Sequence, residues 1–581
     1  MKRLSRWGAL ALAFVCALVG VGCSGSAGPL VSDTVTSSAA SSSSTSSSSV
    51  GSNSTGSLSV SSGLSSSERT SSATSSATSS ETPVIPPRLS TMVKKNAFYA
   101  PSPADCVYTL DVSGVDGDTV DMLRTLQGLI ARYDGGALYL MASDADLFWK
   151  NYAANEIGIY FQETTVEKLL TRYADLIGGV ILYTPGTFEY ETAFDLALYD
   201  DCLIATEEVA RRFALTSFGR VTDLRNVYAD QRAAYADVLK RLPASVEYAY
   251  WLGESGAFAD YAYAVRAPMF RLAPEERTAW LDAVSLGEES RPFRGVVFLE
   301  DEDVPRTAVA EKGVGLLNVK GFGNATFFSS VTTTKKYTPK QSAVTQPGRE
   351  GETYVTFLLR SQSLGDTVNT DYAAWKAQSG RVPVAYEFPT ALSELAPMIV
   401  MWYQGASVDS SRLIAGGWCA VEEKSVSYAA YREWHTVNNA MMAACGLDIT
   451  VTDSLREDAI YGENFGDCST ATGIFVADGS GNGSVWMSKN TPVIVSVSCK
   501  SVPAMDLWLS SLTAQKRPCY YVVSMTVSAF SQPYDRLPDE PNGAVTSVTM
   551  TEVILSHMEP SDSPLRAVTA EDLIAGGRLT P

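Results

Sequence analysis

The sequence predicts a multi-domain α/β protein, with N-terminal α/β domains followed by a (β/α) barrel-like C-terminal domain. Short apolar runs alternate with helical segments along most of the chain, a rhythm typical of a largely parallel sheet. About 490 residues follow the low-complexity start, enough for two to four domains. Since 45% of the residues are hydrophobic, the chain can bury a large core.

The start of the chain predicts an export signal. Lys2, Arg3 and Arg6 precede an apolar run that is shorter than the roughly 20 residues of a membrane-spanning helix. Cys23 follows small residues in a way that resembles a bacterial lipobox, although Gly20 stands where Leu is usual. We therefore expect Cys23 to be lipidated, which would anchor the protein to the extracellular face of the cell membrane. An ordinary secretory signal is the alternative.

A tether comes next. Residues 24–82 are almost all Ser, Thr, Gly and Ala, and Pro83, Pro86 and Pro87 follow. Such a segment has too little apolar surface to offset its ordering entropy, so we expect a disordered spacer. A spacer of this length reaches on the order of 40 Å.

The segments behind the fold class follow in chain order. Met122–Ile130 has helical periodicity and precedes a strand-like run, Ala137–Met141. Tyr428–Cys445 predicts a long helix that ends at Gly446. Further strands are predicted at 178–183, 295–299, 354–359, 384–386, 473–476, 491–498 and 519–526. The resulting division is a signal peptide (1–23), a linker (24–88), an N-terminal α/β domain (95–200), a second α/β region (201–335) and a C-terminal domain (345–581).

Composition excludes several functions. The net charge of −19 argues against nucleic acid as a partner. There are two histidines, His435 and His557, and no CxxC motif, so we predict no metal site and no cofactor. His435 lies on the apolar face of its predicted helix, which favours packing over catalysis. Seven cysteines remain beyond Cys16 and Cys23, and their pairing cannot be derived from sequence.

Several segments together resemble the GxGYxYP family of exported bacterial proteins, which are presumed glycoside hydrolases. The first are Thr125–Arg132, Leu138–Leu140 and Phe148–Trp149, and later landmarks follow in the right order up to Leu395–Pro397. The resemblance covers about residues 95–581 and implies a carbohydrate ligand.

The chain departs from the family pattern at two places. The signature motif should fall near Ile414–Val421, where Gly417 matches its second Gly and Trp418 replaces a Tyr. Asp366 matches an acidic turn of the family, but Leu364 replaces a second acidic residue there. These losses put hydrolytic activity in question, so whether the chain is an enzyme stays open.

Glycoside hydrolysis normally needs two carboxylates, one on either side of the scissile bond. In barrel folds the site lies on the loops after the carboxyl ends of the strands. Asp366, Glu302 and Glu387 all follow predicted strands, so we expect Asp366 and one of the two glutamates to form the catalytic pair. Glu302 belongs to an acidic run, Glu300–Asp303, that could also be a charged turn, and Asp366 could cap its own turn.

Aromatic and amide side chains complete the expected site. Trp418, Trp402 and Tyr403 would form a stacking wall for a sugar ring, and Asn324 would bind a hydroxyl group. Gly417 would allow close approach of the backbone. The alternatives are that Trp418 belongs to the core, which its size favours, and that Asn324 caps a loop.

Two functions remain open. The first is an extracellular glycoside hydrolase. The second is a glycan-binding envelope lipoprotein on a hydrolase-like scaffold that has lost catalysis. A solute-binding lipoprotein would fit the tether, but not the family resemblance. The sequence does not indicate the sugar, the linkage or the stereochemical outcome.

Overall fold

The computed structural model describes residues 90–273, 276–300, 306–333, 348–378, 380–408, 410–422, 425–453, 467–477, 485–513, 517–536, 546–560 and 562–577. Residues 88–581 form one compact unit, to which every element below belongs. Among the described residues, no helix combines the length and the apolar character that a bilayer crossing requires.

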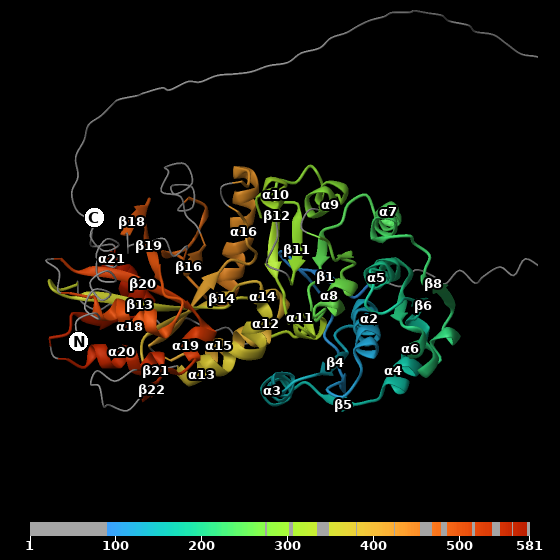
Figure 1. Ribbon diagram of the computed structural model, residues 1–581, viewed down its shortest axis with the longest axis horizontal. Coiled ribbons are helices and arrows are strands. Elements are labelled where there is room, and N and C mark those ends of the chain that lie inside the picture. The colour runs from blue at the N-terminus through green and yellow to red at the C-terminus, as the bar shows by residue number, and fades with distance from the viewer. Residues whose placement is uncertain are drawn as a thin grey trace, which may run out of the picture. The chain divides into compact units, whose positions relative to one another are not determined.

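Three small parallel sheets come first along the chain (Figure 1). The first has the order β4-β3-β5 and consists of β3 (Val107–Asp111), β4 (Leu138–Met141) and β5 (Phe161–Glu163), with helices α2 (Gly117–Asp134), α3 (Asp144–Tyr152) and α4 (Val166–Arg172). The second has the order β7-β6-β8 and consists of β6 (Gly179–Leu182), β7 (Cys202–Ala205) and β8 (Arg220–Asp223), with α5 (Glu189–Asp200), α6 (Glu207–Arg212) and α7 (Gln231–Arg241).

The third sheet has the order β10-β9-β11-β12. Its strands are β9 (Tyr248–Trp251), β10 (Met269–Phe270), β11 (Gly295–Leu299) and β12 (Val314–Asn318), and its helices are α8 (Ala259–Ala264), α9 (Arg277–Ala283), α10 (Arg306–Glu311) and α11 (Ala325–Ser330). A short antiparallel pair, β1 (Val93–Lys94) with β2 (Tyr99–Ala100), precedes all three sheets.

Local chemistry explains helix α2. Its start is capped by Asp116, whose carboxylate accepts the backbone N–H of Thr119 at 2.9 Å. It ends at Gly135, which has a φ of 77° that an L side chain rarely adopts. Met122 and Leu126 on its apolar face are fully buried, as the periodicity predicts.

The C-terminal half contains a closed parallel barrel, which confirms the predicted fold class. In the described part of the chain its ring runs β13-β14-β15-β16-β17-β19-β20 and returns to β13. The ring strands are β13 (Thr353–Arg360), β14 (Val384–Pro389), β15 (Ser411–Gly416), β16 (Ile449–Thr452), β17 (Gly473–Val476), β19 (Thr491–Ser498) and β20 (Cys519–Thr526). Two further strands join its edges, β18 (Val485–Ser488) along β19 and β23 (Leu565–Ala567) along β13.

Helices accompany the ring strands (Figure 1). They are α12 (Leu364–Asp366), α13 (Tyr372–Gln378), α14 (Leu392–Leu395), α15 (Pro397–Ala406), α16 (Tyr428–Cys445), α18 (Val502–Ser510), α19 (Val527–Ser531), α20 (Met550–Met558) and α21 (Ala570–Gly577). A hairpin, β21 (Tyr534–Arg536) with β22 (Thr546–Val548), lies between α19 and α20 in the sequence. The helix expected at Tyr428–Cys445 is α16, and Gly446 ends it in the left-handed conformation.

The barrel interior is apolar in its middle. Every ring strand contributes to this layer, through residues that include Leu358, Ala385, Ile414, Val451, Phe475, Ile494 and Val522. Leu573 and Ile574 of α21 belong to the same cluster. Since Ile574 packs at Gly473, where β17 begins, α21 closes the amino-terminal end of the barrel. Among the described residues, the amino-terminal end of the interior is therefore closed.

The N-terminal sheets are fastened to the barrel by specific contacts. The Trp149 indole N–H donates to the Val368 carbonyl at 2.7 Å. Glu394 of α14, which is 4% exposed, accepts the backbone N–H groups of Asn96, Ala97 and Phe98 at 3.0, 3.1 and 2.9 Å. These hydrogen bonds join helix α3 and the segment between β1 and β2 to the C-terminal half.

Candidate active site at the barrel mouth

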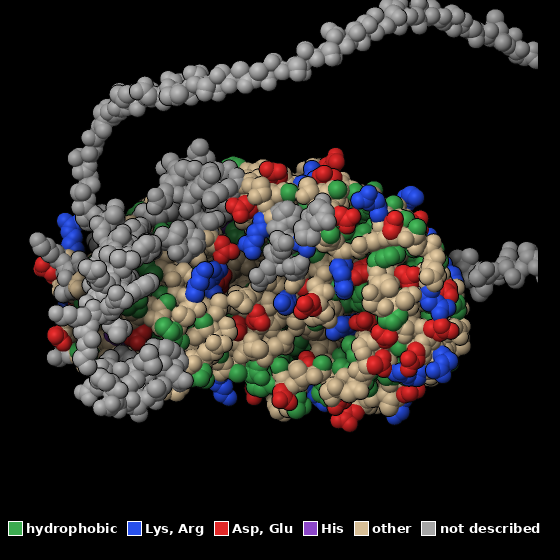
Figure 2. Space-filling view, viewed as in Figure 1, with side chains coloured by type: hydrophobic (Ala, Val, Ile, Leu, Met, Phe, Trp, Pro, Cys, Tyr) green, Lys and Arg blue, Asp and Glu red, His purple; other side chains and the backbone are tan. Residues whose placement is uncertain are grey.

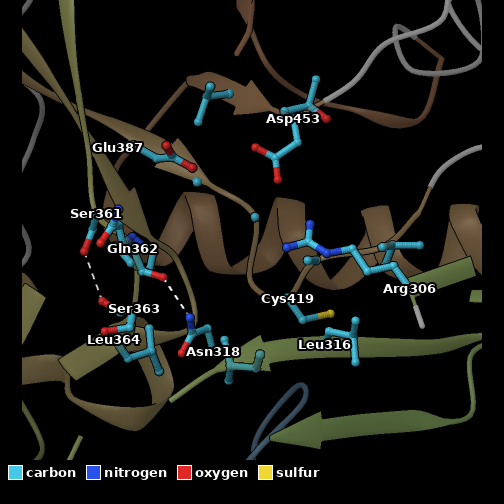
Figure 3. Close-up of a pocket in the computed structure, with 18 of the residues that line it drawn as sticks. Arg306, Leu316, Asn318, Ser361, Gln362, Ser363, Leu364, Glu387, Cys419 and Asp453 are labelled. Atoms are coloured by element: carbon cyan, nitrogen blue, oxygen red, sulfur yellow. Dashed lines mark hydrogen bonds between the residues drawn. The ribbon is translucent and has the colours of Figure 1, made fainter. Parts of the chain in front are cut away.

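A cleft of about 440 Å³ lies at the carboxyl-terminal mouth of the barrel (Figure 3). Ends of five ring strands line it, through Arg360, Glu387, Gly416, Asp453 and Thr526. This end of a barrel is where enzymes of such folds place their catalytic groups, because the loops there can vary without disturbing the ring.

Strand register explains why these side chains point inward. Arg360 lies two residues after Leu358, and Glu387 lies two residues after Ala385, so each is on the same face as the apolar layer. Arg360 and Glu387 are also direct partners across β13 and β14. The site is thus a polar layer that lies directly above the apolar one.

Arg360 joins two carboxylates. Its Nε donates to Glu387 Oε2 at 2.5 Å, while its Nη2 donates to Asp453 Oδ1 at 2.5 Å and to Glu387 Oε1 at 3.4 Å. Because both acceptors lie on one nitrogen, these two oxygens are separated by at most about 6 Å, the sum of the two Nη2 distances. This upper limit leaves room for the roughly 5–5.5 Å between the carboxyl groups of a retaining glycosidase.

Burial sets the protonation of Glu387. Its side chain is 16% exposed, and burial raises the pKa of Glu387 above its usual value. The attraction of Arg360 opposes this shift, and the charge of Asp453 adds to it. A carboxyl group with a raised pKa beside a more exposed carboxylate is the arrangement that separates a general acid from its partner.

The opposite wall comes from the third sheet. Leu316 of β12 pairs with Ala420 through reciprocal backbone hydrogen bonds of 2.9 and 2.6 Å. The Asn318 amide donates to the Gln362 carbonyl at 3.0 Å. Figure 3 shows Arg306 reaching into the cavity from the side opposite Glu387. The cleft is therefore built jointly by the barrel and the N-terminal part.

The predicted catalytic residues are only partly brought together. Glu387 lines the cleft. Asp366 is half-buried in α12, where its backbone N–H donates to Ser363 Oγ at 3.0 Å, and its side chain is not part of the cleft lining. Glu302 lies outside the described residues, as does Cys23. Glu300 points instead into a buried turn, where it accepts the Tyr250 hydroxyl at 2.7 Å.

The predicted stacking wall is packed into the core. Trp418 is 2% exposed, lies edge-on to Phe98 at 5.8 Å between ring centroids, and donates its indole N–H to the Trp434 carbonyl. Tyr403 is fully buried and donates its hydroxyl to the Thr367 carbonyl at 2.7 Å. No face of either ring is left for a sugar, so the structure corrects the prediction for both.

The remaining three residues differ among themselves. Trp402 is half-buried and packs edge-on against Trp149 at 5.7 Å, away from the cleft lining. Asn324 is buried and exchanges hydrogen bonds of 2.8 Å with the backbone of Leu140, which is a structural role. Gly417 does line the cleft, and a Cβ there would lie 3.1 Å from the Trp434 ring. The absence of a side chain thus lets the backbone of Gly417 lie close to the Trp434 ring.

Sequence reasoning missed Arg360 and Asp453. Both immediately follow strand-like runs, since Arg360 ends β13 and Asp453 follows the β-branched run Ile449–Thr452. Their position in alternation with the apolar layer was a usable signal.

Within the described residues, no cluster of three His, Cys, Asp or Glu side chains is arranged to hold a metal ion.

Comparison with known protein families finds one match in the N-terminal part of the chain. Residues 107–175 match the first N-terminal domain of the GxGYxYP family. This match supports membership of the GxGYxYP family. The resemblance drawn from its sequence landmarks is thereby confirmed, and no curated protein matches the chain.

Solved structures agree on the fold. A presumed hydrolase from Bacteroides thetaiotaomicron VPI-5482 superimposes with a TM-score of 0.71 at 17% identity, covering 84% of this chain and 99% of that chain. At 17% identity, this similarity shows that the two proteins share a fold and shows nothing about their function. A presumed polysaccharide deacetylase from Mycobacterium smegmatis reaches a TM-score of 0.30 at 8% identity, covering 42% of this chain and 96% of that chain, which is too low to carry an argument.

Proposed function

We propose that this GxGYxYP protein hydrolyses glycosidic bonds at the barrel mouth, with Glu387 as the general acid and Asp453 as the second carboxylate. The observation that carries the proposal is the pair of carboxylates on one guanidinium, with oxygens at most about 6 Å apart, at the open end of the barrel. The raised pKa of Glu387 supports its role as the proton donor. The region of the family's signature motif supports it too, because Gly416 and Gly417 line the same cleft.

Release of reducing ends from a panel of oligosaccharides tests the proposal. The fragment that begins at Arg88, one compact unit, should turn over at least one substrate. Glu387→Gln and Asp453→Asn should each lower turnover by about 10²–10⁴. Asp448→Asn is the matched control, because Asp448 is an exposed carboxylate just before the amino-terminal end of the same strand, β16, and should turn over like the parent. Turnover that survives both cleft substitutions would refute the assignment.

A second candidate is a glycan-binding protein that has lost catalysis. Arg360 supports this candidate, because it contacts both carboxylates and so opposes protonation of either. Calorimetric titration with the same oligosaccharides distinguishes the two. Binding without turnover, lost in Glu387→Gln, would favour the binding protein over the hydrolase.

We also propose that the protein is exported and held at the extracellular face of the membrane through a lipid on Cys23. The support is the charged start, the short apolar run and the Ser-rich segment that follows. Metabolic labelling with a palmitate analogue should mark the wild type and leave Cys23→Ala unlabelled. Equal labelling of the two would show that another residue, or none, carries the lipid.

A further inference from the structure

Arg306 brings a positive charge into the barrel cleft that the proposed chemistry does not use. It is the first residue of α10 and lies in the wall that the N-terminal part contributes. Its side chain is exposed and reaches into the cavity from the side opposite Glu387 (Figure 3). A ligand that fills the cleft would therefore lie between the Arg306 guanidinium and the Glu387 carboxyl group.

The Arg306 guanidinium has no counter-ion of its own. In the part of the chain that the structure describes, it donates no hydrogen bond and forms no ion pair. Arg360, the other arginine of the cleft, is held between Glu387 and Asp453. A free guanidinium presents five N–H donors in a planar fork, which matches the oxygens of a carboxylate or of a tetrahedral oxyanion. Arg306 is thus available to a ligand, whereas Arg360 is not.

The charges of the lining leave room for an anion at Arg306. Among the described lining residues are two guanidinium groups and three carboxyl groups, those of Glu387, Asp453 and Glu422. Arg360 balances Asp453, and Glu387 is the group proposed to carry a proton, because burial raises its pKa. Glu422 is half-buried, and it forms no ion pair with Arg306 or with any other described residue. The positive charge of Arg306 is therefore not neutralised by the cleft itself.

We propose that the cleft selects an acidic glycan, with the Arg306 guanidinium binding the carboxylate or the sulfate ester of a sugar ring beside the scissile bond. The inference rests on the proposed carbohydrate ligand of this cleft and names its class. Hydrogen bonds between a guanidinium and an anion are roughly twice as strong as those between neutral groups. Arg306 would thus favour a charged substituent over a hydroxyl group at this position, without taking part in proton transfer.

Calorimetric titration of the full chain measures this selectivity. The probes are oligosaccharides of galacturonate, mannuronate and glucuronate, each beside its carboxyl-reduced neutral form, and sulfated galactan oligosaccharides beside their desulfated form. At least one acidic probe should bind about 10–100-fold more tightly than its neutral form, the value of a hydrogen bond to a charged group. The carboxylate and sulfate probes together identify which anion the cleft takes.

Four variants assign the selectivity to Arg306. Arg306→Gln should remove it, so that the acidic probe and its neutral form bind alike, whereas Arg306→Lys should retain part of it because the charge remains. Lys312→Gln is the matched control, since Lys312 directly follows α10 and carries the same charge but does not line the cleft. Glu422→Gln should leave the binding of the acidic probe unchanged or tighter, because it removes a like charge from the same lining.

The selectivity and the hydrolysis can fail separately. Binding of an acidic probe that depends on Arg306, without release of reducing ends, would refute the hydrolysis alone. Turnover of neutral oligosaccharides that Arg306→Gln leaves unchanged would refute the selectivity alone. The proposal is also overturned if no acidic probe binds, if the neutral forms bind as tightly, or if chitosan oligosaccharides, which carry amino groups, bind in their place and depend on Glu422.

Discussion

Arg360→Met tests the arrangement at the barrel mouth most directly. Methionine keeps much of the aliphatic stem and removes the guanidinium that contacts Glu387 and Asp453. Glu387 then retains its buried position without its cation. Asp453 is less affected, because 59% of its side chain is exposed and water can solvate its charge.

The magnitude follows from burial. Two unit charges about 4 Å apart attract by about 4 kcal/mol at an effective dielectric constant of 20. Removing one partner of a buried pair costs about 3–5 kcal/mol. Because Arg360 and Glu387 retain 26% and 16% exposure, we expect the lower end, about 3 kcal/mol at pH 8. For a cooperative unit of about 490 residues, this corresponds to a fall in melting temperature of about 3 °C.

The loss should depend on pH in a defined direction. The folded-state pKa of Glu387 is already raised, so its contribution to stability is present at low pH and is lost as pH rises through that pKa. Removing Arg360 removes the main influence that lowers this pKa, so the pKa rises further. The difference in melting temperature between wild type and Arg360→Met should therefore be small at pH 4 and grow toward pH 8.

Thermal denaturation monitored by circular dichroism, at pH 4 and at pH 8, measures both effects. The double variant Arg360→Met/Glu387→Gln should recover at least half of the loss at pH 8, because no buried charge is left unpaired. Arg232→Met is the control, since Arg232 pairs with Glu276 at 3.5 Å with 85% and 36% of the two side chains exposed, and it should cost less than about 1 kcal/mol. Wild-type stability of Arg360→Met at pH 8, or no recovery in the double variant, would refute the reasoning.

Three other predictions concern the scaffold. Glu394→Gln places amide hydrogens against the backbone donors of residues 96–98, and we expect a loss of about 2–4 kcal/mol in unfolding free energy by chemical denaturation. Gly365→Ala should cost about 1–3 kcal/mol, because its Cβ would collide with the Lys320 carbonyl, whereas Gly117→Ala, with open space around its Cβ, should be neutral. Burial lowers the pKa of His435 to about 3, so stability should be lost as pH falls from about 6.5 toward 3, by about 2 kcal/mol at pH 5. His435→Phe should abolish that part of the loss, and an unchanged acid-denaturation profile would contradict the assignment.

Local patterns were enough to predict much of the fold. The runs 295–299, 473–476, 491–498 and 519–526 are strands β11, β17, β19 and β20 with the expected bounds. Each is a run of apolar and β-branched residues that is buried in a parallel sheet. Strands buried on both faces form continuous apolar runs, so their bounds are easy to recognise in the sequence. Helix α16 was equally clear, because its apolar face and its terminal glycine agree.

The site was harder to predict, because its composition depends on which face of each strand points inward. Trp418 directly follows Gly417, which lines the cleft, yet its ring turns into the core against Phe98 and Phe293. A shift of one residue along an extended segment exchanges ligand-facing for core-facing positions. Sequence patterns predicted where strands end, and therefore predicted Glu387. They did not predict which side chains from other strands lie beside Glu387 in the folded barrel. Asp453 is adjacent to Arg360 only because the barrel closes.

Local sequence patterns could not predict the wall formed by β12, because this wall depends on contacts between distant parts of the chain. Leu316 and Ala420 are far apart in sequence, and their pairing depends on the third sheet lying against the mouth of the ring. Gly315 shows how close this contact is, because a Cβ there would collide with the Cys419 sulfur. One wall of the proposed catalytic cleft therefore belongs to the N-terminal part, and Arg306 brings a positive charge from there to face the carboxylates of the barrel. On the face seen in Figure 2, acidic and basic side chains are interspersed. Because β12 and α10 form this wall, changes in them should alter ligand binding at the cleft without altering the ring.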